Sequence, residues 1–156
     1  MKRSLRMVVA LAAVAAAAFC ADNTLGTWKL NPEKSQAPAG LPKITSLMVV
    51  RTAAGDAVKV TVKGEREDKS KVDVSYTAKY DGKEVALSGS GLPYDTLAIK
   101  QLNANTLTDV RTKKGGPYKG TGRFEVSPDG KTATLTTKGT GADGKPFASK
   151  TVYEKQ

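Results

Sequence analysis

Residues 57–63 read AVKVTVK, and this stretch decides the fold class. Valine occupies every second position from 58 to 62, and lysine or threonine occupies the positions between them. Successive side chains of a β-strand point to opposite faces, so the valines share one face and the polar residues share the other. The stretch therefore predicts a strand with one buried face and one face in water.

The same alternation recurs along the chain, beginning with the stretch that follows. There the apolar row consists of Val72, Val74, Tyr76, Ala78 and Tyr80. Turn-forming combinations of Gly, Asp, Asn and Pro separate such stretches at intervals of about 10 to 14 residues, which leaves no room for helical crossovers. We expect about ten strands, which start near residues 25, 44, 57, 71, 84, 95, 106, 118, 131 and 146.

These strands are best accommodated in a closed barrel. An open sheet of this size would leave two long unpaired edges, and closure removes both of them. The sequence therefore predicts an all-β domain, a single antiparallel up-and-down β-barrel of about 8–10 strands. Gly120 and Gly122 lie on the same face of a strand as Phe124, where they indicate a bend, a close backbone approach, or only a weakened strand.

The first 21 residues have the pattern of a secretory signal peptide. Three cations precede an apolar, alanine-rich run that ends at Phe19 and is shorter than the roughly 20 residues of a membrane-spanning helix. We therefore expect a signal peptide over 1–21, one domain over 22–156, and no transmembrane span. The expected location is the periplasm or the outside of the cell.

Cys20 is the only cysteine, so the mature domain cannot contain a disulfide. Its position leaves two routes of processing open. The small residues Ala16 and Ala18 suit ordinary signal-peptide cleavage. The run from Ala17 to Cys20 also resembles the end of a bacterial lipoprotein leader, which would place a lipid anchor at Cys20, but Phe19 stands where such leaders have a small residue. We favour ordinary cleavage over an outer-membrane lipoprotein.

The chain is basic, with 25 Lys and Arg against 15 Asp and Glu and a formal net charge of +10. Removal of the three leader cations leaves 22 basic residues and a charge of +7. The lysines are spread over all segments without interleaved aromatic residues, so we do not expect a nucleic-acid partner. Lysines on solvated faces and sheet edges explain the charge by solubility and edge protection. We expect a monomer.

Residues suited to catalysis are scarce. The absence of histidine excludes Ser-His and Cys-His nucleophile pairs and histidine metal sites. Glu65, Glu67 and Asp68 alternate with basic residues at a predicted turn, which is typical of a solvated hairpin tip and lacks the spacing of a Ca²⁺ loop. We therefore expect no catalytic residues, no cofactor and no metal, and a protein that is not an enzyme.

The longest predicted connection directly follows the strand that holds Trp28, the only tryptophan. It covers residues 31–43 and contains Pro32, Pro38 and Pro42, which disfavour pairing within a sheet. We expect a loop here, either a surface crossover or a cover over a binding site.

Gly26-Thr27-Trp28, at the head of the first predicted strand, resembles the G-x-W motif that opens lipocalin barrels. More widely, residues 25–156 are similar over nearly their whole length to small exported bacterial proteins described as lipocalin-like, most of them of unknown function. The segments that carry this likeness are GTWKLNPEKS, SYTAKYDGK, SPDGKT, TTKGTGADGKPF and VYEK. Unlike true lipocalins, the chain has nearer ten than eight predicted strands and no disulfide.

The resemblance implies roles for a few residues. In lipocalins the motif tryptophan closes one end of the barrel, and an arginine from a late strand packs on it, a contact worth about 0.5 to 2 kcal/mol. Arg123 is the implied counterpart here, and Arg111 is the alternative. Tyr76 and Tyr80 offer rings and hydroxyls that suit an amphipathic ligand, although they equally suit a filled core. The candidate ligand-binding residues are thus Tyr76, Tyr80, Trp28, Arg111 and Arg123.

Two functions remain open for such a barrel. The first is binding of a small apolar or amphipathic ligand in the barrel interior, with the 31–43 loop as a cover. The second is a protein-binding module, such as an inhibitor of a secreted hydrolase, which would insert the 31–43 or the 88–93 loop into its target. A hollow interior favours the first function, and a filled interior with a protruding loop favours the second.

Overall fold

The described part of the chain consists of β-strands and their connections. A computed structural model describes residues 22–38 and 42–156, in which there are eleven strands and no helix. None of these residues therefore belongs to a helix that could cross a membrane. The predicted signal peptide and Cys20 lie outside the described residues. The strands are β1 (Gly26–Gln36), β2 (Ile44–Ala54), β3 (Ala57–Arg66), β4 (Lys71–Ala78), β5 (Asp81–Ala86), β6 (Ser88–Ser90), β7 (Thr96–Asn103), β8 (Thr106–Thr112), β9 (Lys119–Val126), β10 (Thr132–Thr140) and β11 (Pro146–Lys155).

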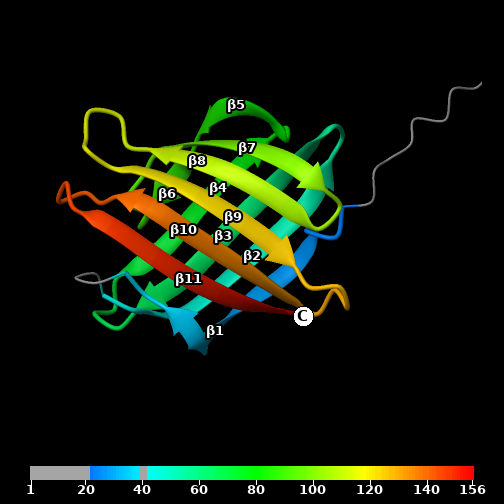
Figure 1. Cartoon of the computed structure of the whole chain (residues 1–156), viewed down its shortest axis with the longest axis horizontal. Helices are drawn as coiled ribbons and strands as arrows, with labels where there is room; N and C mark the ends of the chain where they lie inside the picture. Colours follow the sequence, from blue (N-terminus) through cyan, green and yellow to red (C-terminus); the bar gives the residue numbers. More distant parts are fainter. Residues whose placement is uncertain (1–21, 39–41) are drawn as a thin grey trace, which may run out of the picture.

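All strands belong to one antiparallel sheet that curls into a nearly closed barrel (Figure 1). Their order across the sheet is β5-β7-β8-β9-β10-β11-β1-β2-β3-β4-β6. Pairing of β1 with β11 joins the N-terminal and C-terminal strands, so the layer of β7 to β11 at the front of Figure 1 continues into the layer of β1 to β4 behind it. The predicted all-β up-and-down barrel is confirmed.

The barrel has one strand more than predicted because one segment is divided. β5 pairs with β7 and β6 pairs with β4, and only Leu87 separates the two strands along the chain. We predicted a single strand from residue 84, but its two halves pair with opposite neighbours. The chain itself therefore closes the barrel at Leu87, where the sheet order begins and ends.

The apolar rows of successive strands align inside the barrel. In the register of β2, β3 and β4, Val49, Val62 and Val74 lie side by side. The predicted row of β4 faces inward, since Val72, Val74 and Ala78 are at most 2% exposed. Burial of a valine contributes about 1.5–3 kcal/mol, so this wall stabilises the fold strongly. The same core cluster includes Trp28, Leu30, Ile99, Leu107, Phe124, Val126 and Tyr153.

Trp28 lies at one end of the barrel, beneath the segment that precedes β1. Its side chain is 0% exposed, and its Nε1 donates a hydrogen bond of 2.8 Å to the carbonyl oxygen of Thr24. The ring of Phe124 meets the indole edge-on at a centroid distance of 5.7 Å. The backbone nitrogen of Asn23 donates to the β7–β8 hairpin at 2.9 Å. Residues 22–25 thus cross this end above Trp28.

The loop predicted over residues 31–43 is wrong in its first half. β1 continues to Gln36, which still pairs with β11. The register of this pairing shifts between Asn31 and Gln36. Ser35 maintains this part of the strand, because its Oγ donates to the carbonyl oxygen of Asn31 at 2.7 Å and accepts from a backbone nitrogen of β11 at 2.9 Å. The hydroxyl replaces backbone bonds that the irregular register loses. The connection to β2 is therefore confined to residues 37–43.

Candidate functional site

Three charged side chains lie inside the barrel, at positions that strand alternation assigns to the interior. Arg51 continues the inward row of β2 after Val49, and Asp109 and Arg111 continue that of β8 after Leu107. The side chains of Asp109 and Arg111 are only 11% and 12% exposed. Buried charges are rare unless they are paired, so each of the three requires a specific partner.

Asp109 and Arg111 form a two-pronged ion pair with each other. The Nε and Nη2 atoms of Arg111 lie 2.6 and 2.9 Å from the two carboxylate oxygens of Asp109. The Arg111 guanidinium also lies over the Tyr94 ring, 5.2 Å from its centre, so it does not pack on Trp28. Gly122 on the adjacent strand leaves the space that the carboxylate occupies. This pair is neutral as a unit and satisfies its own strongest polar groups.

Arg51 has fewer partners than Arg111. Its Nη1 donates to the hydroxyl oxygen of Tyr80 at 3.3 Å, and its guanidinium carbon lies 4.8 Å from the centre of the Phe124 ring. Its Nε is buried without a hydrogen-bond partner. Burial opposes the charge, but the neighbouring tyrosines Tyr76, Tyr80 and Tyr153 together raise the pKa of Arg51. A guanidinium is in any case a cation in a protein. Within the described residues, no carboxylate forms an ion pair with it.

Gln101 on β7 holds a second buried side-chain nitrogen, Nε2, without a partner. Gln101, Leu107 and Phe124 share one interior row across β7, β8 and β9. Tyr80 connects this row with Arg51, because its carbonyl oxygen accepts from the Gln101 backbone nitrogen at 3.4 Å and its hydroxyl accepts from Arg51. The two unpartnered donors therefore belong to residues that both contact Tyr80.

Tyrosines supply most of the remaining interior polar groups. Burial raises the pKa of Tyr153 to about 12, and burial also raises the pKa of Tyr76, Tyr94 and Tyr118. These phenols are therefore neutral near pH 7, and each can donate and accept a hydrogen bond. Towards the end remote from the N-terminal segment, the rings of Tyr94, Tyr118 and Phe147 stack with centroid separations of 5.7 and 5.5 Å.

Several polar side chains of the interior are not fully buried. Arg51, Tyr76, Tyr94 and Arg111 are each half-buried. The guanidinium groups of Arg51 and Arg111 lie over the rings of Phe124 and Tyr94. Polar and aromatic side chains therefore meet in this part of the barrel.

The arginine predicted to pack on Trp28 lies elsewhere. Arg123 is exposed on the outer face of β9, and its Nη2 lies 2.9 Å from the Oε1 atom of Glu125. Alternation explains this placement, because Phe124 points inward and its neighbour must point outward. The cation over the indole is Lys155, whose Nζ lies 5.0 Å from the ring centre. Arg123 is therefore not part of the interior site.

The other candidates lie within the barrel. Tyr76 and Arg111 are half-buried, Tyr80 contacts Arg51, and Trp28 is fully buried at one end. Three interior residues were not predicted, namely Arg51, Asp109 and Gln101. Each occupies the inward phase of its strand, and a polar residue at an inward position was the available signal.

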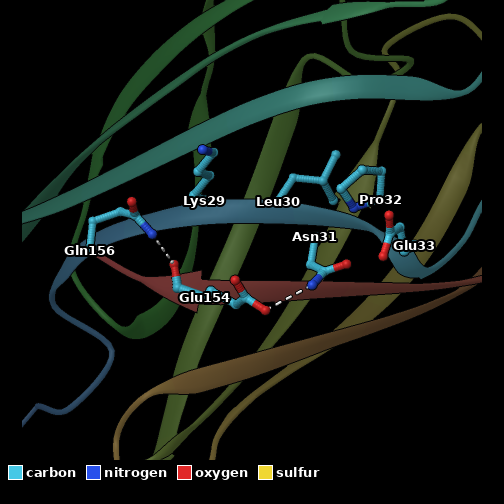
Figure 2. Close-up of a pocket in the computed structure, with 7 residues that line it drawn as sticks. All are labelled: Lys29, Leu30, Asn31, Pro32, Glu33, Glu154 and Gln156. Carbon is cyan, nitrogen blue, oxygen red and sulfur yellow. Dashed lines mark hydrogen bonds between the residues drawn. The ribbon is translucent and has the colours of Figure 1, made fainter.

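Two hollows open on the outer surface, and Asp109 and Gly122 also belong to the lining of the second. The first, of about 350 Å³, follows the joint between β1 and β11, where the Nδ2 of Asn31 donates to Glu154 at 2.8 Å (Figure 2). The second, of about 580 Å³, lies over the outer face of β7 to β10 beside Val110 and Lys138. Both are open to solvent, so neither encloses a ligand as a barrel interior can.

Comparison with known proteins supports the fold. No protein-family model matches the chain, and no curated protein matches it. Among solved structures, it is similar to zebrafish ileal bile acid-binding protein in complex with cholic acid. The two share a TM-score of 0.53 at 15% sequence identity, over 86% of this chain and 100% of that chain. The likeness supports the β-barrel fold of the described residues.

Proposed function

We propose that this protein binds one small amphipathic molecule inside its barrel and is not an enzyme. The observation that supports this most is the set of incompletely partnered polar groups in the interior, where Arg51 Nε and Gln101 Nε2 are buried without hydrogen-bond partners. A core that serves stability alone is close-packed with apolar groups. This interior instead holds charged, amide and phenolic groups.

The two chemical halves of the interior suit the two halves of an amphipathic ligand. The valine rows of β3 and β4 form an apolar wall, represented by Val60 and Val74, which are 0% and 2% exposed. Donors and hydroxyls come from Arg51, Gln101 and Tyr80. Binding sites for small molecules commonly combine such walls with a few placed polar groups. The similar barrel from zebrafish, which was solved with cholic acid, supports this proposal.

A matched pair of threonines tests the location of binding. Thr137 is 4% exposed and points into the barrel, whereas its neighbour Thr136 is exposed on the outer face. We expect Thr137→Leu to weaken binding of an apolar fluorescent probe about tenfold or more, because the larger side chain would compete with the probe for the barrel interior. Thr136→Leu should leave the affinity unchanged. Equal affinities in both variants would place the probe outside the barrel and refute the proposal.

Inhibition of a secreted hydrolase is the alternative. It requires a protruding loop, and the segments considered for this role are partly strand. β1 includes residues 31–36, and β6 occupies 88–90 in pairing with β4. Arg66 further restrains the segment after β6, because its Nη2 donates to the carbonyl oxygen of Gly91. No feature of the described barrel favours inhibition over ligand binding.

We further propose that the domain over 22–156 acts after export, in the periplasm or outside the cell. The leader pattern of residues 1–21 supports this proposal. The mass of the protein purified from its own host tests it. Loss of the leader is the expected result, an added acyl mass at Cys20 would indicate the lipoprotein route, and an intact leader would refute export.

A further inference from the structure

We infer that the ligand carries an anionic, carboxylate-type head group, and that Arg51 and Gln101 bind it. This inference rests on the proposed function, because it names the chemistry of the molecule that the barrel holds. Arg51, Asp109 and Arg111 are charged side chains that face the described interior. Asp109 and Arg111 neutralise each other, so the positive charge of Arg51 is left without a counterion.

The hydrogen bonds of Arg51 are equally incomplete. A guanidinium has five N–H donors, and the contact with Tyr80 at 3.3 Å uses one of them. Its Nε is buried and unpartnered, which is unfavourable for a polar group and more so for a charged one. An anion from the ligand would supply the missing charge and the missing acceptor together.

The geometry around Arg51 favours a planar anion with two oxygens. The Phe124 ring lies 4.8 Å from the guanidinium carbon and restricts the orientation of the group. A guanidinium held in this way presents its donors as a fork that matches a carboxylate. The Nε2 of Gln101, a residue that also contacts Tyr80, adds a neutral donor to the same acceptor.

The interior carboxylate cannot take this role. Asp109 receives both of its close contacts, at 2.6 and 2.9 Å, from Arg111, and the space above Gly122 fixes its position. Each carboxylate oxygen of Asp109 therefore has a donor, whereas the Nε of Arg51 has no acceptor. The two arginines therefore differ in role: Arg111 positions an internal carboxylate, and Arg51 is available to one from outside.

A matched pair of probes tests this inference: dansylaminoundecanoic acid, which is an anion, and its methyl ester, which is neutral. We expect the acid to bind roughly 10- to 100-fold more tightly than the ester. Arg51→Met should abolish this preference and leave ester binding unchanged, and Arg51→Lys should retain part of it. Gln101→Leu should reduce the preference to a smaller extent. Arg123→Met, on the outer face, is the matched control and should change nothing.

The outcomes separate this inference from the proposed function. Equal binding of acid and ester to the natural protein, or a preference that survives Arg51→Met, overturns the head-group site while interior binding stands. Binding of neither probe refutes the proposed function and the inference with it. If Arg51→Met does not fold, the ratios of acid affinity to ester affinity in the natural protein and in Arg51→Lys decide. Equal affinity of the natural protein for acid and ester is sufficient to overturn the site.

Discussion

The carboxylate of Asp109 lies directly against the α-carbon of Gly122 on the neighbouring strand. The two residues pair in register across β8 and β9, and a β-carbon on residue 122 would lie 2.6 Å from both carboxylate oxygens. Because Arg111 fixes the carboxylate from the other side at 2.6 and 2.9 Å, it cannot simply turn away. The glycine at position 122 is therefore a condition for the buried ion pair.

Gly122→Ala should lower the free energy of unfolding by about 1–3 kcal/mol, the usual range for overpacking. Chemical denaturation measures this loss. Gly116→Ala is the matched control, because a β-carbon there meets the flexible Lys113 side chain at 3.0 Å and the Lys113 carbonyl oxygen at an ordinary contact distance of 3.9 Å. If the two variants lose equal stability, the close approach of Asp109 to Gly122 is not what constrains this position.

Removal of one member of the ion pair should be worse than removal of both. Arg111→Met leaves the Asp109 carboxylate buried without its partner, and we expect a loss of about 3–5 kcal/mol. The double variant Asp109→Ala, Arg111→Met buries no charge and should lose less than the single variant. Denaturation of the two variants and of Asp109→Ala completes the cycle. Additive losses would show that the two side chains do not depend on each other.

The fold was largely predictable because alternation is a local property of the chain. The row of Val58, Val60 and Val62 is inward in the structure as predicted, and all three valines are at most 9% exposed. The division of β5 from β6 was not predictable in this way, because it depends on which distant strand each half meets. The extension of β1 was missed because Ser35 replaces lost backbone bonds with its side chain, and prolines nearby had predicted a loop.

The candidate site was predicted less completely than the fold. Alternation gave the inward direction of Tyr76, whereas Arg111 was named only through the resemblance. The same rule applied to Phe124 would have excluded Arg123. What the pattern could not supply is partnership: Arg111 finds a carboxylate two residues away, and Arg51 finds none. That difference depends on how opposite walls of the barrel pack against each other. The spacing of residues along the sequence carries no information about this packing.

Trp28 should be among the most sensitive positions of the barrel. Its side chain is fully buried, contacts Phe124 and donates to Thr24, so we expect Trp28→Ala to cost about 3–5 kcal/mol. Lys155→Met removes only the cation above the indole and should cost at most about 1 kcal/mol. Thermal or chemical denaturation compares the two. A small loss in Trp28→Ala would mean that residues 22–25 close the barrel end without it.

Alkaline pH should destabilise the protein before its tyrosines ionise in the folded state. Burial raises the pKa of Tyr153 to about 12, whereas an unfolded tyrosine has a pKa of about 10. Between these values the folded state binds more protons, so stability that is fully present below about pH 10 falls as pH rises, by about 1.4 kcal/mol per unit for one such group. Denaturation at several pH values measures the slope. Tyr153→Phe should make it shallower, and an unchanged slope would assign the loss to other groups.

Hydrogen exchange should begin where the chain alone closes the barrel. β6 contributes three residues and pairs only with β4, and β5 pairs with β7 through an irregular register. β2 and β3 pair without interruption from Ser46 to Ala54, and the valines of β3 are buried. Local opening needs least free energy where few hydrogen bonds and few buried contacts must break. We therefore expect amides on both sides of Leu87 to exchange well before those of β2 and β3.

A ligand held inside the barrel should slow this early exchange more than that of β2 and β3, because it binds the closed form. Uniform exchange along the chain would show that the barrel opens only by complete unfolding, and that the break in pairing at Leu87 creates no weak point.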